Sequence, residues 1–285
     1  MRVPAGLQPL IDDGIIDEVI RQLKSGKEAS VYIVASGAAI RCAKVYKAAE
    51  HRGFHKLAEY QEGRRARGSR DARALGRGGR HGRKVQQAEW KNAEVEALYR
   101  LDGAGVRVPR PFGVFDGVLL MELVLDAGGQ PAPRLNEVEL APEQARQWHA
   151  FMMTQIVRML CAGLIHGDLS EYNVLVDASG PVIIDLPQAV NAASNNNAFR
   201  MLERDVHNMR ETFARAAPEL MQTDYAHEIW KLYQAGELTP ETPLTGRYTH
   251  STAAADVDAV LDQIEEARLE AEARARGRAA ADSEL

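Results

Sequence analysis

Three polar side chains in one stretch of the chain could together support phosphoryl transfer. The segment Leu164–Gln188, LIHGDLSEYNVLVDASGPVIIDLPQ, contains Asp168, then Asn173 five residues later and Asp185 twelve residues further. Two short apolar runs separated by turn residues at 177–180 predict a β-hairpin that brings Asn173 and Asp185 together. Mg²⁺ prefers hard oxygen ligands, few of them from protein and the rest from phosphate and water. The amide and the second carboxylate therefore form a candidate magnesium site.

The remaining acid, Asp168, lies on the loop just before this hairpin. There it could orient a substrate hydroxyl and accept its proton as the γ-phosphoryl group is transferred. A single aspartate in this position fits a turn residue as well. The ordered trio is more specific, because it matches the H-x-D-x-x-x-x-N motif of kinases followed by a later aspartate. We therefore predict that Asp168 is catalytic and that Asn173 and Asp185 bind the metal.

A kinase also needs a lysine that binds phosphates and an acid that pairs with it. Lys44 lies in the predicted strand Ile40–Val45, which resembles the V-A-I-K strand of kinases. Glu94, on the helical pattern that follows, is its predicted ion-pair partner. Glu89 and Glu96 are alternatives, but apolar residues lie on the Glu94 side of the predicted helix.

The phosphate loop departs from the usual protein-kinase pattern, since Ser25–Tyr32, SGKEASVY, has one glycine where G-x-G-x-x-G would stand. This loop, the catalytic loop His166–Asn173 and the metal strand Ile184–Gln188 are similar to the S-x-G-K-E-A-x-V-Y, H-x-D-L-S-E-Y-N and I-D-x-x-Q motifs of the RIO family of atypical protein kinases. The resemblance extends over about residues 24–213, and S-E-Y-N at Ser170–Asn173 is its most specific part.

The resemblance implies an α+β, bilobal protein-kinase-like fold, with ATP and Mg²⁺, or Mn²⁺, as cofactors. It implies that Lys44 binds phosphates with Glu94 behind it, and that Asp168 is the catalytic aspartate. It also implies that the backbones of Glu122 and Val124 meet adenine and that the phosphate loop is lined by Ser25 and Lys27. Some RIO proteins act mainly as ATPases in small ribosomal subunit maturation, through a phosphorylated metal-site aspartate, which would be Asp185 here.

The periodicity predicts how the chain divides into elements. β-Branched and aromatic runs predict a hairpin over 30–45 and a second one over 114–124, and helical spacing predicts helices over 90–101, 142–160 and 199–213. An amphipathic helix is expected over Leu7–Lys24. The predicted domains are an N-terminal helical extension (1–23), a β-rich N-lobe (24–124) with an insertion at about 60–84, a mostly α-helical C-lobe (125–250), and a C-terminal helix and tail (251–285).

Composition limits the class of protein. The 285 residues are 45% hydrophobic with a net charge of −5, which argues against a dedicated nucleic-acid-coating protein. Cys42 and Cys161 lack C-x-x-C spacing, which argues against a disulfide framework or thiolate zinc site. No segment has the length of a membrane span or the pattern of a signal peptide. We expect a cytoplasmic protein with no membrane partner, either a monomer or a weak dimer.

One segment departs from this average charge. Arg64–Lys84 contains eight arginines and one lysine against a single acid, with interleaved glycines, and RIO proteins carry an insertion at this place. Guanidinium groups on such a segment could bind RNA phosphates or a ribosomal subunit. The alternative is a solvated loop in an arginine-rich protein. The protein substrate is not indicated by the sequence.

Two other functions are compatible with the motifs. Small-molecule kinases of the aminoglycoside or choline phosphotransferase type share an H-G-D-x-x-x-x-N loop, and Gly167 favours them, but Ser170–Tyr172 and Pro187-Gln188 argue against them. A nucleotide-gated RNA-binding scaffold without catalysis is the second alternative. The presence of all five residues that the chemistry needs argues against it: Lys44, Glu94, Asp168, Asn173 and Asp185. The residues before Lys24 are too few for a winged helix, so a bacterial-type RIO protein is expected.

Overall fold

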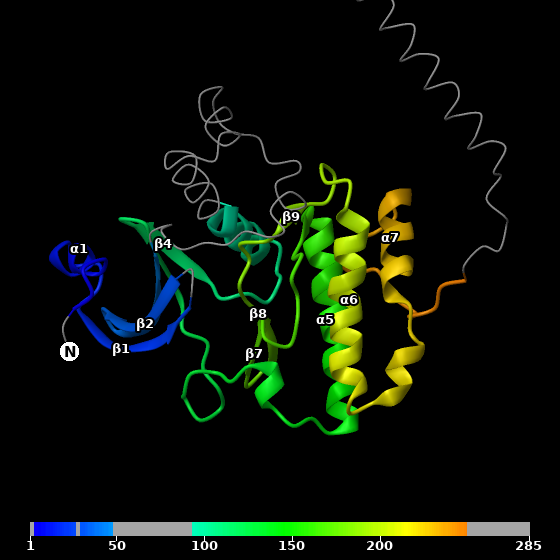
Figure 1. Ribbon diagram of the computed structural model, residues 1–285, viewed down its shortest axis with the longest axis horizontal. Coiled ribbons are helices and arrows are strands. Elements are labelled where there is room, and N and C mark those ends of the chain that lie inside the picture. The colour runs from blue at the N-terminus through cyan, green and yellow to red at the C-terminus, as the bar shows by residue number, and fades with distance from the viewer. Residues whose placement is uncertain (1–2, 27–28, 48–92, 250–285) are drawn as a thin grey trace, which may run out of the picture. The chain divides into compact units, whose positions relative to one another are not determined.

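A computed structural model of the chain describes residues 3–26, 29–47 and 93–249 (Figure 1). Three predicted features lie outside these residues: Lys27, the arginine-rich segment 64–84 and the C-terminal helix expected beyond 250. Contacts group Met1–Arg247 into one unit, so the lobe limits at 124 and 125 stay a prediction.

The N-terminal part is an antiparallel sheet of five strands in the order β1-β2-β3-β5-β4 (Figure 1). Its strands are β1 (Glu18–Ser25), β2 (Ala29–Ser36), β3 (Ala39–Tyr46), β4 (Pro111–Phe115) and β5 (Val118–Glu122). Both predicted hairpins are confirmed. Gly37, Asp116 and Gly117 have the positive φ angles that suit the tight turns between their strands.

The prediction of a helix over Leu7–Lys24 is wrong for the residues after Asp12. The structure has a short helix, α1 (Gln8–Asp12), followed by β1. Gly14, with φ of 67°, ends the helical conformation, and residues from Glu18 onward pair with β2. Leu7, Leu10 and Ile16 are buried against the sheet. The apolar spacing in this segment fits a helix locally, but its antiparallel pairing with β2, which begins four residues after β1 ends, decides its structure.

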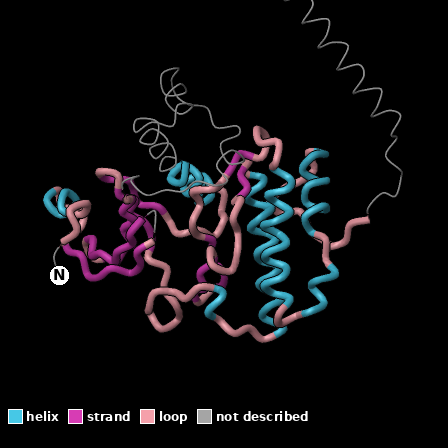
Figure 2. Tube along the Cα trace, in the orientation of Figure 1, coloured by secondary structure: helices cyan, strands magenta, loops and turns pink. Residues whose placement is uncertain are grey.

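Helices are the longest regular elements in the rest of the described chain (Figure 2). The helix described over 93–103 precedes β4, and α5 (Pro142–Cys161), α6 (Ala198–Ala214) and α7 (Tyr225–Ala235) pack together. Pro142 begins α5, a position where its missing N–H costs nothing. Two 3₁₀ helices, Leu135–Glu137 and Pro218–Gln222, lie in the connections. The predicted α+β fold and its helices over 142–160 and 199–213 are confirmed.

Two small antiparallel ladders lie in the segment between α5 and α6. One pairs β6 (Leu164–Ile165) with β9 (Val190–Asn191), and the other is the predicted hairpin of β7 (Val174–Asp177) and β8 (Gly180–Ile183). Val174, Val182 and Ile183 are almost completely buried. The hairpin is therefore anchored in the core, and the residues at its two ends, where the candidate metal ligands lie, are fixed by it.

Candidate active site

A lysine on the central strand of the sheet lies between two carboxylates. The Lys44 Nζ donates to Glu94 Oε1 and lies 3.3 Å from Asp185 Oδ1. Lys44 comes from β3, Glu94 from the helix at 93–103, and Asp185 from the segment that follows β8. Glu96 on the same helix is exposed, and Glu89 lies outside the described residues. The structure thus brings together three predicted site residues from distant parts of the sequence.

Tyr46 supports this cluster from the same strand, which the sequence analysis missed. Its hydroxyl donates to Glu94 Oε2 at 2.8 Å, so both oxygens of this buried carboxylate accept hydrogen bonds. Burial alone would lower the pKa of Lys44, but the Glu94 and Asp185 carboxylates outweigh it and raise that pKa. Lys44 therefore stays a cation, as a phosphate-binding group requires.

A cavity of about 540 Å³ lies beside the cluster, lined by Lys44, Glu94 and Asp185. Its wall continues along Met121–Val124 at the end of β5, where the backbone is predicted to meet adenine. The Val124 carbonyl accepts a hydrogen bond from Ala132 N at 2.9 Å, which fixes this stretch against the following loop. The apolar wall includes Val31, as an adenine pocket needs.

The predicted phosphate loop is described only in part. Ser25 Oγ lies 3.3 Å from Ser30 Oγ and accepts a hydrogen bond from Lys47 Nζ at 2.8 Å. Lys47 also donates to the Gly26 carbonyl at 2.7 Å. These contacts hold the two ends of the loop together across the strands, and Gly26 lines the cavity.

Asp168 and Asn173 are connected through the backbone of the catalytic loop. The Asn173 Nδ2 donates to the Asp168 carbonyl at 2.9 Å, which leaves the Asn173 amide oxygen as a potential metal ligand. Ile184 N donates to the Asn173 carbonyl at 3.0 Å, so the residue before Asp185 is adjacent to Asn173. Asp185 has φ of 68°, a costly conformation for a non-glycine residue, and its side chain is half exposed.

The donor set fits magnesium. An amide oxygen and a carboxylate, placed at neighbouring ends of one hairpin, are the hard ligands that Mg²⁺ accepts while keeping phosphate and water as further ligands. Within the described ranges, no group of three or more His, Cys, Asp or Glu side chains could hold a metal. The candidate magnesium ligands are one amide, Asn173, and one carboxylate, Asp185.

A fully buried carboxylate on α6, Asp205, supports the catalytic loop from behind. It accepts hydrogen bonds from Gly167 N at 2.8 Å and Leu169 N at 2.9 Å, the two amides that flank Asp168. Arg204 donates to the Gly167 carbonyl and Asn208 Nδ2 donates to the Leu169 carbonyl. Sequence reasoning missed these residues because they lie 36 to 39 positions after the loop residues they contact, with no motif to mark them.

Burial also acts on Asp168, the predicted catalytic aspartate. It raises the pKa of Asp168, and the nearby Asp185 carboxylate adds to this effect, whereas His166 and Arg204 oppose it. His166 is buried, with Nε2 3.1 Å from the Ile184 carbonyl. A raised pKa makes the Asp168 carboxylate a better proton acceptor than an exposed aspartate.

The family-specific S-E-Y-N stretch has an anchoring residue. Glu171 Oε2 accepts a hydrogen bond from Thr212 Oγ1 at 2.6 Å, and its Oε1 pairs with Arg215 at 2.9 Å. Both partners lie at the end of α6. Glu171 therefore holds the catalytic loop to this helix, whereas Tyr172 is exposed.

The chain has two cysteines, Cys42 and Cys161. Both are free, and burial raises the pKa of Cys42, which lines the cavity, to about 12. Among the described residues, no helix has the length and apolar character to cross a membrane.

Comparisons with known proteins agree with this geometry. The sequence matches the RIO domain family over residues 30–226. The RIO-type serine/threonine-protein kinase Rio1 of Haloferax volcanii is 35% identical over 212 residues, which cover 74% of this chain and 68% of the relative. The serine/threonine-protein kinase RIO1 of Homo sapiens is 30% identical over 225 residues, covering 74% of this chain but 36% of the relative.

A solved structure shows the same fold. The Rio2 kinase of Chaetomium thermophilum, in its ADP/Mg²⁺-phosphoaspartate complex, has a TM-score of 0.52 and 25% identity, covering 74% of this chain and 59% of that chain. Of the two enzyme families that the motifs allowed, the matches favour the RIO kinases over the small-molecule phosphotransferases. The roles of the individual site residues stay predictions. The chain belongs to the RIO family of serine/threonine-protein kinases.

Proposed function

We propose that the chain transfers the γ-phosphoryl group of ATP to serine or threonine hydroxyls of a protein substrate or of itself, and that it also hydrolyses ATP. The observation that carries this proposal is the position of Lys44 between Glu94 and Asp185 on the wall of a nucleotide-sized cavity. Phosphoryl transfer is catalysed mainly by positioning and by electrostatic stabilisation of the phosphate oxygens, and this cluster can supply both.

Each side chain has a role in this mechanism. Lys44 binds the α- and β-phosphates, and Glu94 holds it in place. Asp168 orients the attacking hydroxyl and accepts its proton. Asn173 and Asp185 hold Mg²⁺, which when bound neutralises charge on the phosphates. We propose Mn²⁺ as a substitute, since carboxylate and amide oxygens suit that ion as well.

We further propose Asp185 as a transient phosphoacceptor. The Rio2 kinase to which this chain is similar was solved with a phosphoaspartate. The Asp185 carboxylate is half exposed and lies 3.3 Å from the Lys44 ammonium, which can bind an incoming phosphoryl group. A carboxylate oxygen of Asp185 would attack the γ-phosphorus as ADP leaves, and water would then release phosphate from the acyl phosphate. That sequence of steps gives ATPase turnover without a protein substrate.

The proposed partner is RNA or a ribosomal subunit. The support is the composition of Arg64–Lys84, which contains eight arginines, and its position as an insertion between Lys44 and Glu94. We also propose that the protein acts in the cytoplasm as a monomer or weak dimer.

The test is incubation of purified protein with γ-labelled ATP, with and without Mg²⁺, following free phosphate, self-labelling and labelling of ribosomal fractions. Asp168→Asn is the matched control, since the amide keeps the shape of the side chain but cannot accept the proton. Label on Asp185 should be released by hydroxylamine, whereas label on serine or threonine should not. Nucleotide binding without either hydrolysis or labelling would instead support the scaffold alternative.

A further inference from the structure

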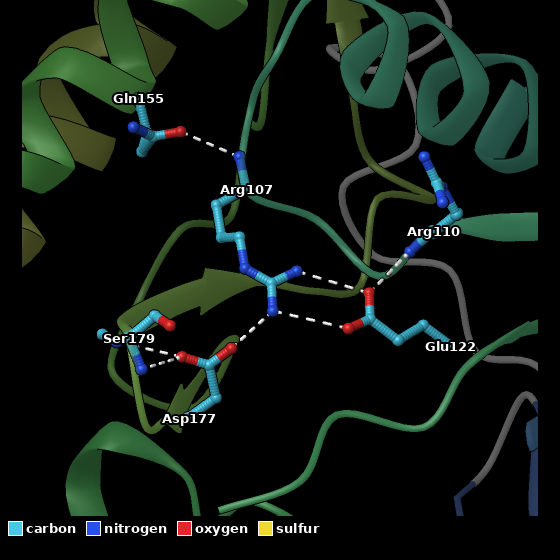
Figure 3. Close-up of polar contacts among 7 residues, drawn as sticks. Arg107, Arg110, Glu122, Gln155, Asp177 and Ser179 are labelled. Atoms are coloured by element: carbon cyan, nitrogen blue, oxygen red, sulfur yellow. Dashed lines mark hydrogen bonds and ion pairs between the residues drawn. The ribbon is translucent and has the colours of Figure 1, made fainter. Parts of the chain in front are cut away.

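An arginine between the helix at 93–103 and β4 connects four parts of the chain (Figure 3). The backbone N–H of Arg107 donates to Gln155 Oε1 at 2.8 Å, a buried side chain on α5. Its carbonyl accepts a hydrogen bond from Ile183 N, on β8, at 2.9 Å. The backbone of Arg107 is thus fixed on two sides, to α5 and to β8.

The guanidinium group extends from this fixed point to two carboxylates (Figure 3). Its Nη1 and Nη2 lie 3.3 and 3.4 Å from the two oxygens of Glu122, and Nη2 also pairs with Asp177 Oδ2. The Arg107 and Glu122 side chains are about one-third exposed, whereas that of Asp177 is 10% exposed. Partial burial and the shared guanidinium give the pairs a defined geometry that isolated surface pairs lack.

The two carboxylates mark two different ends of the nucleotide site. Glu122 is the last residue of β5, at the stretch proposed to meet adenine. Its side chain also accepts from Arg110 N at 3.1 Å, and its own N–H donates to the Arg110 carbonyl at 2.8 Å. Asp177 is the last residue of β7, in the hairpin that carries Asn173 and Asp185 at its other end.

Asp177 is rigidly held where it meets the arginine. Its Oδ1 accepts hydrogen bonds from Ser179 N at 2.7 Å and Gly180 N at 2.9 Å, which form the turn of the hairpin. Its other oxygen is left for Arg107 (Figure 3). A movement of the hairpin is therefore transmitted to the guanidinium and from there to Glu122.

We infer that Arg107 is a positioning residue that fixes the distance between the adenine-binding end of β5 and the metal-binding hairpin. This inference rests on the proposed function, because it assumes that one nucleotide spans both ends of the cavity. A ligand that occupies both ends gains from having them held at the right separation, whereas a ligand that occupies one end does not. Arg107 should therefore matter more for ATP with Mg²⁺ than for adenosine.

Binding is measured by calorimetry for adenosine and for a non-hydrolysable ATP analogue with Mg²⁺, on the full chain. The variants are Arg107→Met, which removes the guanidinium but keeps the stem, Arg107→Lys and the nearly isosteric Asp177→Asn, with Arg110→Ala as the matched control. For Arg107→Met and Asp177→Asn, we expect the Kd of the ATP analogue to rise about five- to tenfold, which is near the tenfold that corresponds to 1.4 kcal/mol. We expect the Kd of adenosine to change less than about twofold, since one subsite is intact.

Two further results would support the inference. Arg107→Lys should recover part of the loss, because an ammonium can pair with one carboxylate but not bridge both. Arg107→Met and Asp177→Asn together should cost less than the product of their separate effects, because both break the same connection. If Arg107→Met fails to fold, Asp177→Asn alone provides the comparison between the two ligands.

Three outcomes count against it. Equal losses for adenosine and the ATP analogue would mean that Arg107 only stabilises the end of β5. Unchanged affinity for both ligands would mean that the network has no role in binding. These two outcomes overturn the inference and leave the proposed function intact. Failure of the unmodified protein to bind the ATP analogue with Mg²⁺ overturns the proposed function, and the inference with it.

Discussion

The buried carboxylate behind the catalytic loop should make the stability of the protein depend on pH in a specific way. Asp205 is fully buried, and this burial raises its pKa from the ordinary 3.8 to about 6 in the folded protein, while its hydrogen bonds from Gly167 and Leu169 and the charges of His166 and Arg204 oppose the rise. The unfolded chain exposes the group to water, where it keeps its ordinary pKa. The folded state therefore binds more protons at this site than the unfolded state between pH 4 and pH 6.

The sign and size of the pH dependence follow from the difference in the pKa of Asp205 between the folded and unfolded states. Stability contributed by Asp205 is complete below the unfolded pKa and is lost as pH rises through the folded pKa. A shift of about two pKa units corresponds to about 3 kcal/mol in the free energy of unfolding over the whole titration, of which about 2 kcal/mol is lost between pH 4 and pH 6. His149 acts in the opposite direction, because burial, with a contribution from the Arg210 charge, lowers its pKa to about 4. The pH profile of the unmodified protein alone would therefore contain the contributions of both Asp205 and His149.

Comparison with Asp205→Asn isolates the carboxylate, because the variant retains His149 and every other titrating group. Urea unfolding of both proteins at pH 4, 5, 6 and 7 gives two stability curves. The stability of the unmodified protein minus that of the variant should fall by about 2 kcal/mol from pH 4 to pH 6 and level off by pH 7. A difference that does not change with pH would refute the reasoning. Turnover of the variant should fall at every pH, because its amide cannot accept from both loop N–H groups.

Three further predictions concern the proposed chemistry. Asp168→Ala should abolish phosphoryl transfer while the ATP affinity measured by titration stays nearly unchanged, and normal turnover would remove Asp168 from the mechanism. Lys44→Ala should weaken ATP binding and lower kcat by about 100-fold, and an unchanged ATP affinity with an unchanged kcat would remove Lys44 from the mechanism. Replacement of Arg64, Arg65, Arg67 and Arg70 by serine should weaken RNA binding. The slope of log affinity against log salt concentration should fall by about 0.7–0.9 for each phosphate contact removed, and an unchanged slope would place the contacts elsewhere.

Local pattern predicted most elements that position the site. The turn at Asp116-Gly117, the start of α5 at Pro142 and the hairpin between Asn173 and Asp185 all depend on residues within a few positions of one another. The β1 strand could not be predicted this way. Its residues Val19, Ile20 and Leu23 are spaced as on a helix, and only the pairing with β2, five to seventeen positions away, makes the segment extended.

The residues of the candidate site also fall into two groups, those that a sequence motif predicts and those that only the folded structure shows. Lys44, Glu94 and Asp185 were predicted because their residue types and order follow a known motif, and the structure brings them together. Tyr46, Asp205 and Arg107 were not predicted. None of them belongs to the chemical motif, and each acts through a contact with a residue far away in the sequence: Tyr46 with Glu94, Asp205 with the loop amides, and Arg107 with Glu122 and Asp177.

These unpredicted contacts explain why the stretch that carries the motif contains residues beyond those that the chemistry needs. The stretch from His166 to Asp185 is fixed at three places: its loop amides to Asp205, Glu171 to the end of α6, and Asp177 to Arg107. Only part of it faces the nucleotide cavity. A carboxylate such as Glu171 is then required for anchoring rather than for chemistry, because without it the loop loses both Thr212 and Arg215. Replacement of Glu171 should consequently loosen the loop and lower turnover, even though Glu171 does not line the cavity.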